Sequence, residues 1–258
     1  DYAKTLNADY IATGHYARVI HQDGKDSIML KGLDNNKDQS YFLCQLNQQQ
    51  LQNSLFPLGE IDKQEVRRLA HELKLPVADK KDSTGICFIG ERDFKKFLQN
   101  YIPAQPGKMV DIETGDVIGD HSGIMYYTIG QRKGLGIGGP GAAWFVVGKD
   151  YDKNVLYICQ GDQKDWLYSS GALITDVNWI ASNKPTEKIN CNAKFRYRQM
   201  DNPIQLEFVD EKTVYLTFDK PVKAVTPGQA AVFYDGDVCL GGGTIDTVYK
   251  DGEPIKYL

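Results

Sequence analysis

Cys87 is the residue whose surroundings best suit covalent chemistry. It follows a polar, glycine-containing segment, residues 82–85, and a cysteine after such a loop can be exposed and ionisable, as a thiolate nucleophile or a sulfur carrier must be. Its direct neighbours Ile86 and Phe88 are apolar, so a small buried core residue is an equally good interpretation. The remaining cysteines lie inside alternating or apolar runs, which is typical of packing residues: Cys44, Cys159, Cys191 and Cys239.

The five cysteines also limit the class of protein. None forms a CxxC pair, so a zinc site built from paired ligands is not expected, and we predict no metal-ligating residue. An odd count argues against a disulfide scaffold and favours a reducing compartment, so we expect a cytoplasmic protein. No apolar run is long enough to span a bilayer, and residues 1–16 do not resemble a signal peptide. We therefore expect no membrane partner.

Two polar segments near the start of the chain could contact a ligand. Gly14 and His15 follow the apolar run 10–12, and open α/β sheets bind ligands at the carboxyl ends of their strands. The pattern alone nevertheless favours an ordinary turn with a surface histidine. Lys37 and Gln39 could hold a phosphate or a base edge, while Asp38 could orient Lys37 or cap the next helix. A solvated helix start explains the same residues, and their spacing alone favours it.

A basic stretch lies later in the chain. The net charge of −4 and the pI near 5.6 mean that a nucleic acid would have to bind through a local basic surface. Residues 194–198, Lys-Phe-Arg-Tyr-Arg, alternate in character, so in a strand the three cations would share one face and the two aromatics the other. That face could follow phosphates while an aromatic side chain stacks on a base. A solvated face of a barrel fits the pattern equally well.

A series of glycines occupies residues 134–141, directly after Gln131, Arg132 and Lys133. The dinucleotide-binding fingerprint requires a helix after its glycines, whereas residues 144–147 have the pattern of a strand. We therefore reject a dinucleotide site. A loop that wraps around a backbone and a simple turn both remain possible interpretations.

The elements that must position these residues change in character along the chain. Helices and strands are mixed at first, and the clearest helix is residues 61–75, with Asp62 as its cap, Glu65 completing a capping box and Pro76 ending it. From Lys108 onward the pattern is one of short strands separated by turns. The last part of the chain predicts a small barrel of six strands: residues 173–179, 189–198, 204–208, 213–218, 230–234 and 239–245.

Six segments occur together in the order and spacing of the tRNA-specific 2-thiouridylases, which this sequence resembles over nearly its whole length. The segments at 82–90 and 126–139 are highly specific to this family, whereas Thr-Gly-His (13–15) or Arg-Tyr-Arg (196–198) alone would be weak evidence for it. The six are ATGHYAR (12–18), KDQSYFL (37–43), FPLG (56–59), DSTGICFIG (82–90), YYTIGQRKGLGIGG (126–139) and KFRYRQ (194–199).

The resemblance implies a multidomain α/β plus β architecture. Residues 1–103 would be the C-terminal part of an ATP-pyrophosphatase-type catalytic domain, residues 104–170 a small β-rich central domain, and residues 171–258 a tRNA-binding β-barrel. Cys87 matches the persulfide-bearing cysteine of the family, and Gly14 matches a nucleotide contact. The positions that match tRNA contacts are His15, Lys37, Asp38, Gln39, Arg196, Tyr197 and Gln229.

The strand expected at residues 189–198 sets a geometric condition on two of these contacts. Neighbouring residues of a regular strand face opposite sides. Arg196 and Tyr197 could both touch RNA only at a bulge or at a strand end.

The implied reaction is 2-thiolation of the wobble uridine of tRNA. ATP, with Mg²⁺ expected beside its phosphates, adenylates the C2 oxygen, and a persulfide sulfur on Cys87 replaces it. The sulfur would come from a cysteine desulfurase or a sulfur relay protein. The Ser-Gly-Gly-rich pyrophosphate loop of the family, and the second cysteine that would form a disulfide with Cys87, are not in these residues. We therefore expect the chain alone to be inactive.

Two other functions remain open. A different ATP-pyrophosphatase enzyme, such as an amide-forming ligase or another tRNA thiolase, would need no sulfur on Cys87. A non-catalytic RNA-binding protein built from the β-rich parts would have no pyrophosphate loop in its gene.

Overall fold

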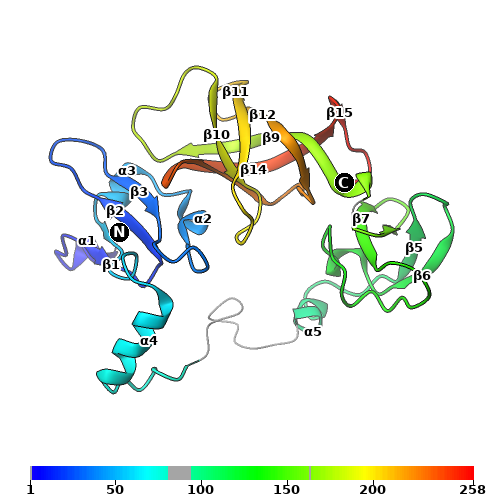
Figure 1. Ribbon diagram of the computed structural model, residues 1–258, viewed down its shortest axis with the longest axis horizontal. Coiled ribbons are helices and arrows are strands. Elements are labelled where there is room, and N and C mark those ends of the chain that lie inside the picture. The colour runs from blue at the N-terminus through cyan, green and yellow to red at the C-terminus, as the bar shows by residue number, and fades with distance from the viewer. Residues whose placement is uncertain (1, 81–93, 163) are drawn as a thin grey trace. The chain divides into compact units, whose positions relative to one another are not determined.

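In the computed structural model, the described residues are 2–80, 94–162 and 164–258 (Figure 1). The prediction for Cys87 therefore lies outside the described residues. The chain divides into two compact units, each of which is described by itself. The first unit comprises residues 1–80, 171–220 and 227–247, and the second comprises residues 81–170, 221–226 and 248–258.

The first unit begins with short helices and strands. The sequence Asp23-Gly24 is a turn signal that predicts a hairpin, and a hairpin forms there, with Gly24 at the positive φ of +67° that the turn requires. In its register Ala17 pairs with Lys31 and Ile20 with Ile28. The elements are α1 (Tyr2–Thr5), β1 (Ile11–Ala12), β2 (Ala17–Ile20), β3 (Ile28–Lys31), α2 (Ser40–Leu43), α3 (Gln48–Leu51), β4 (Ser54–Leu55), which is parallel to β1, and α4 (Lys63–Glu72).

Helix α4 shows which part of a local prediction held. The Asp62 side chain caps it by accepting a hydrogen bond from the Glu65 amide at 2.8 Å, as predicted. The Glu65 carboxylate, however, binds the Arg68 guanidinium. The spacing of Val66, Leu69, Ala70 and Leu73 predicts a buried apolar stripe, but none of the four is buried, and Leu73 is 67% exposed. Amphipathic spacing forms a helix locally, but burial needs a partner surface, and the described residues cover this face only in part.

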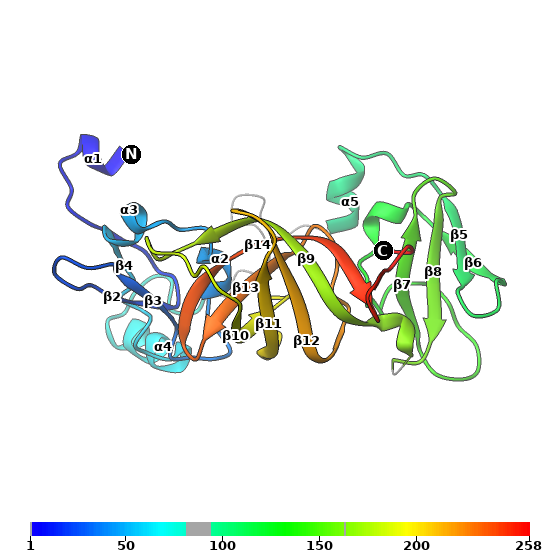
Figure 2. The same ribbon diagram turned by 90° about the horizontal axis from the view of Figure 1, so that it is seen from above.

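Six strands close into the predicted barrel (Figure 2). Their order is β13-β10-β11-β12-β9-β14, and β13 pairs with β14 to complete the ring. Strand β3 joins the edge of β14 through the Val238–Leu30 pair, so the β2–β3 hairpin extends the barrel's sheet. The strands are β9 (Tyr168–Trp179), β10 (Ile189–Lys194), β11 (Asn202–Phe208), β12 (Val214–Lys223), β13 (Ala230–Asp235) and β14 (Val238–Lys250).

Alternating apolar residues of these strands fill the barrel. Ala193, Leu206 and Leu216 are fully buried, as is Phe233, because each strand turns every second side chain inward. The predicted class, α/β elements together with a small β-rich region and a barrel, is confirmed.

The second unit holds a separate four-stranded sheet of order β6-β5-β8-β7. Its core includes Met109, Val146 and Leu156, all fully buried. Trp144 opens strand β7, so the strand predicted at residues 144–147 is confirmed, and the glycine series is followed by a strand instead of the helix that a dinucleotide fingerprint requires. The elements are α5 (Phe94–Gln99), β5 (Gly107–Asp111), β6 (Val117–His121), η1 (Ile124–Tyr126), β7 (Trp144–Asp150), β8 (Val155–Gln160), η2 (Asp165–Leu167) and β15 (Glu253–Pro254), which pairs with β14.

Candidate functional site

The predicted polar residues meet where two loops of the first unit face each other. One loop, residues 34–39, follows β3, and the other, residues 195–201, follows β10. A cavity of about 540 Å³ lies between them, which we call the two-loop pocket; it is lined by residues 31, 35–38, 194 and 197–201. Residues far apart in sequence thus share one site because the β2–β3 hairpin is joined to the barrel.

Asp38 lies inside this site rather than on its surface. Only 4% of the residue is exposed. Its Oδ1 accepts hydrogen bonds from the backbone amides of Gly32 and Ser40, both at 3.1 Å, and its Oδ2 receives the Lys194 ammonium at 3.3 Å. The bond to Ser40, the first residue of α2, is the cap-like role that the sequence allowed. Both carboxylate oxygens therefore have hydrogen-bond partners within the protein and hold the loop in place.

A second carboxylate completes an ion cluster under the pocket. The Lys31 ammonium contacts Asp201 at 2.5 Å and the Gly236 carbonyl at 3.0 Å, and Lys194 lies 3.8 Å from Asp201. Both ammonium groups also lie over the Tyr234 ring, at 4.5 and 5.3 Å from its centroid. Two cations and two carboxylates therefore compensate one another where water is largely excluded.

Gln39 connects this cluster to the Gly14 turn. Its backbone amide donates to the Tyr16 carbonyl at 2.8 Å, and its side-chain oxygen accepts from the Tyr16 amide at 3.0 Å. His15 is half-buried, with its Nδ1 2.9 Å from the Thr13 hydroxyl. Gly14 is exposed just past the carboxyl end of β1, and a Cβ there would meet only Leu58, at 3.8 Å. Its backbone is therefore open to a ligand.

The strand predicted for residues 195–198 is wrong. Strand β10 ends at Lys194, and a turn follows, because the Gln199 side chain accepts from the Phe195 amide at 2.9 Å and the Gln199 amide donates to the Arg196 carbonyl at 3.0 Å. The three cations do not share a face: Lys194 is buried by its ion pairs, and Arg198 is exposed. The strand end that would let Arg196 and Tyr197 reach the same ligand is present.

Aromatic side chains form one wall of the site. The Tyr197 hydroxyl donates to the Lys37 carbonyl at 3.2 Å, and its ring lies 4.5 Å from that of Phe42, which is 57% exposed. Burial raises the pKa of Tyr197 and lowers the pKa of the half-buried Arg196 guanidinium. An exposed aromatic face beside cations is an arrangement that can stack on a base and contact its phosphate.

Tyr41 links this wall to the barrel. Its hydroxyl donates to the Ala230 carbonyl at 2.9 Å, and burial raises its pKa to about 12, so it stays a donor at neutral pH. Gln229, the residue before Ala230, is exposed. The structure thus brings Lys37, Asp38 and Tyr197 together at the two-loop pocket, with Gln39 and Arg196 next to them in the chain. His15 and Gln229 are the chain neighbours of Tyr16 and Ala230, which Gln39 and Tyr41 bond.

Several residues of the site were not predicted. Phe42, Lys31 and Asp201 were not among the predicted site residues. A lysine ending the apolar strand 28–30 was a signal that could have pointed to a buried partner, since a lysine enters a core only when paired. Asp201 gave no such signal, because its role depends on two chain segments far from it.

The described cysteines are neutral packing residues. Burial raises the thiol pKa of Cys44 and Cys159 to about 11 and that of Cys191 to about 12, and it also raises the pKa of Cys239. None of these four would be an appreciable thiolate at neutral pH. Within the described ranges, no three His, Cys, Asp or Glu side chains gather as metal ligands.

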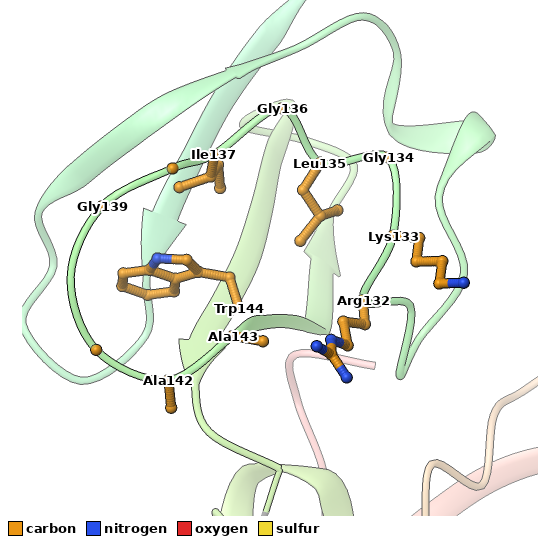
Figure 3. A pocket seen from close by; sticks show the side chains of 12 residues that line it. Arg132, Lys133, Gly134, Leu135, Gly136, Ile137, Gly139, Ala142, Ala143 and Trp144 are labelled. Carbon is orange, nitrogen blue, oxygen red and sulfur yellow. The ribbon is translucent and has the colours of Figure 1, made fainter.

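A second hollow lies in the second unit. The glycine loop, residues 134–141, curves around a cavity of about 510 Å³ lined by residues 132–139 and 141–144 (Figure 3). Gln131 fixes its start by accepting from the Thr128 amide at 3.0 Å and donating to the Lys133 carbonyl at 2.9 Å. In neither unit do the described residues include a helix long and apolar enough to cross a membrane.

Comparison with known proteins places these observations in one family. Three family models match successive parts of the chain: the tRNA methyl transferase HUP domain over residues 1–91, the tRNA methyl transferase PRC-barrel domain over residues 95–160, and the aminomethyltransferase beta-barrel domain over residues 169–245. The sequence is 56% identical to the tRNA-specific 2-thiouridylase MnmA of Bacillus cytotoxicus and 55% identical to those of Bacillus thuringiensis and Bacillus cereus. Each match spans all of this chain and 69% of the relative.

Proposed function

This chain belongs to the tRNA-specific 2-thiouridylase family, and on that premise we propose that its protein catalyses ATP-dependent 2-thiolation of the wobble uridine of tRNA. The observation that carries the proposal is the meeting of Lys37 and Asp38 with Tyr197 at the two-loop pocket, with Gln39 and Arg196 as their direct neighbours in the chain. These residues come from opposite ends of the chain, and nothing in the barrel alone would require them to meet. Two cations and an aromatic wall are the chemistry that an RNA backbone and an unstacked base require.

The roles of the site residues follow from what each can reach. Lys37 and Arg196 bind phosphates, while Tyr197 and Gln229 contact the nucleotides between them. Asp38 and Gln39 act through the loop, because their side chains bond Lys194 and Tyr16. His15 lies beside the Gly14 turn, where the base must arrive after it leaves the anticodon stack.

The nucleotide end of the site is the Gly14 turn. Bound ATP supplies adenylation of the uridine C2 oxygen, which turns that oxygen into a leaving group. The exposed Gly14 backbone past the end of β1 fits an approaching nucleotide. No three His, Cys, Asp or Glu side chains of the described residues gather as metal ligands. Mg²⁺ would balance the charge of the ATP phosphates, and none of the steps assigned to these residues depends on it.

The sulfur end of the site is Cys87. In our proposal a cysteine desulfurase or a sulfur relay protein loads its thiol as a persulfide. The terminal sulfur attacks C2 of the adenylated uridine, the C2–O bond breaks, and AMP leaves with that oxygen. The sulfur attacks either while still bound to Cys87 or after release as hydrosulfide. In both routes the thiolate of a second cysteine attacks the Cys87 sulfur, the S–S bond to the transferred sulfur breaks, and a disulfide forms between the two cysteines. Persulfides suit this step because they stay nucleophilic near neutral pH.

We further propose three domains: residues 1–103, 104–170 and 171–258. The three matching family ranges support a division close to these limits. The first carries the nucleotide and sulfur chemistry, and the last carries Arg196, Tyr197 and Gln229.

Substituting Cys87 tests the proposal. In the complete gene product, Cys87→Ser should bind tRNA with unchanged affinity but form no 2-thiouridine, because a hydroxyl cannot carry the extra sulfur. Nucleoside mass spectrometry of reacted tRNA measures the product. Cys191→Ser is the matched control, since that thiol is half-buried and protonated, and it should leave thiolation intact. Thiolation by Cys87→Ser at the unmodified protein's rate would eliminate the assigned role.

A further inference from the structure

The glycine loop of the second unit surrounds a cavity, and hydrogen bonds fix the start of the loop. Gly130 donates to the Val146 carbonyl at 2.7 Å and Val146 to the Gln131 carbonyl at 3.0 Å, which ties the start of the loop to β7. Leu135 is buried and anchors the arc in the core. Figure 3 shows the arc curving past the half-buried Trp144, with Arg132 and Lys133 on the other side of the hollow.

The charge around this loop differs from that of the whole chain. The protein has 34 Asp and Glu among 258 residues, yet residues 121–149 contain none. Arg132 and Lys133 are both exposed, and neither forms an ion pair with any described side chain. An acidic protein therefore presents two uncompensated cations beside a cavity, which favours a phosphate-bearing ligand.

Gly138 is a glycine that the fold does not explain. Gly136 and Gly139 need glycine because their φ angles are +72° and +123°. Gly138 has no positive φ, and a Cβ built on it would meet nothing within 4 Å. Neither strain nor crowding excludes a side chain there. A bare backbone at such a position suits a ligand that approaches closely.

We propose that the glycine loop is a second RNA-binding site, which holds a single-stranded nucleotide with its phosphates on Arg132 and Lys133. Its base lies against Trp144 and the backbone at Gly138, in a cavity whose volume of about 510 Å³ suits one nucleotide. The site rests on the proposed function, because tRNA is the RNA it takes. It adds a contact surface in the second unit to the surface around Arg196.

The cation pair is tested first. The double variant Arg132→Ser, Lys133→Ser should bind tRNA about tenfold more weakly at low salt, and the slope of log affinity against log salt should fall by about 1–2. The matched control is Lys108→Ser, Lys153→Ser in the same unit. It removes the same charge, but from lysines already paired with Asp120 and Asp150, so its affinity and slope should change much less.

Gly138→Val tests the bare backbone separately. Because a Cβ at this position would meet no described atom within 4 Å, the thermal unfolding temperature should stay the same while tRNA binding weakens several-fold. Both sets of variants binding like the control would overturn the inference. So would tRNA binding that is unchanged while binding of an acidic protein is lost, since the occupant would then be a protein. If Arg196→Ala weakens tRNA binding while these variants do not, the inference fails and the proposed function stands.

Discussion

At the scale of single residues, Arg196 combines charge with partial burial. Its guanidinium lies near the Tyr41 hydroxyl, and burial lowers its pKa. A cation held in place in this way loses little freedom when it binds a phosphate, so it should contribute more than a freely moving surface lysine.

Arg196→Ala should therefore weaken tRNA binding and lower the salt slope by about 1. A filter-binding titration at several salt concentrations measures both. Arg68→Ala is the control, because Arg68 is exposed on α4 and paired with Glu65 and Glu72. Affinity and slope that match the control would remove Arg196 from the interface.

Asp38 has one partner that the sequence predicts and one that it does not. Its sequence context offered capping of the next helix, and the bond to the Ser40 amide agrees with that. Its charged partner, Lys194, lies far away in sequence and could not be named. Local hydrogen bonds depend on neighbours that the sequence displays, whereas a buried ion pair depends on the finished fold.

At the scale of elements, the barrel strands were predictable because alternation reflects a packed inner face. The end of β10 was not. Residues 194–198 continue the alternation, but the burial of Lys194 beside Asp38 and Asp201, and the turn closed by Gln199, stop the strand. Amphipathic spacing likewise predicted α4 and its cap, but could not show that its apolar stripe stays partly uncovered.

The ion cluster fastens the end of β10 to the loop after β3. Lys194→Met leaves Asp38 buried without its cation, which should lower the free energy of unfolding by about 3–5 kcal/mol. Adding Asp38→Asn should recover part of that loss, because the uncompensated charge is gone. Urea denaturation of the single and double variants measures the effect.

Lys188→Met is the control for this experiment. Lys188 precedes the same strand, and its pair with Glu207 is exposed, so its loss should change stability too little to resolve. A Lys194→Met variant as stable as Lys188→Met would mean that the cluster does not hold the loop.

At the scale of the whole molecule, the surface around Arg196 exists only once three remote parts of the chain have assembled. The β2–β3 hairpin must join β14, the barrel must close, and β10 must end at Lys194. The sequence could supply the candidate residues and the family. The sequence could not show that these residues meet, because no local pattern encodes the pairing of β3 with β14.

The whole molecule also separates the rival functions. A purely β-rich RNA-binding protein would not include a region that matches the HUP domain over residues 1–91, the range that contains Cys87. The net charge of −4 is compatible with RNA binding through local cations, and such cations are Lys37 and Arg198 at the two-loop pocket and Arg132 and Lys133 at the glycine loop.

The central claim is that sulfur passes to tRNA through Cys87, and the mass of the peptide that carries this residue tests it most directly. The complete gene product is incubated with a cysteine desulfurase and free cysteine, alkylated and analysed by mass spectrometry. We predict one additional sulfur atom on the Cys87 peptide, lost again when tRNA and ATP are added. Thiolated tRNA with no additional sulfur ever found on that peptide would contradict the account.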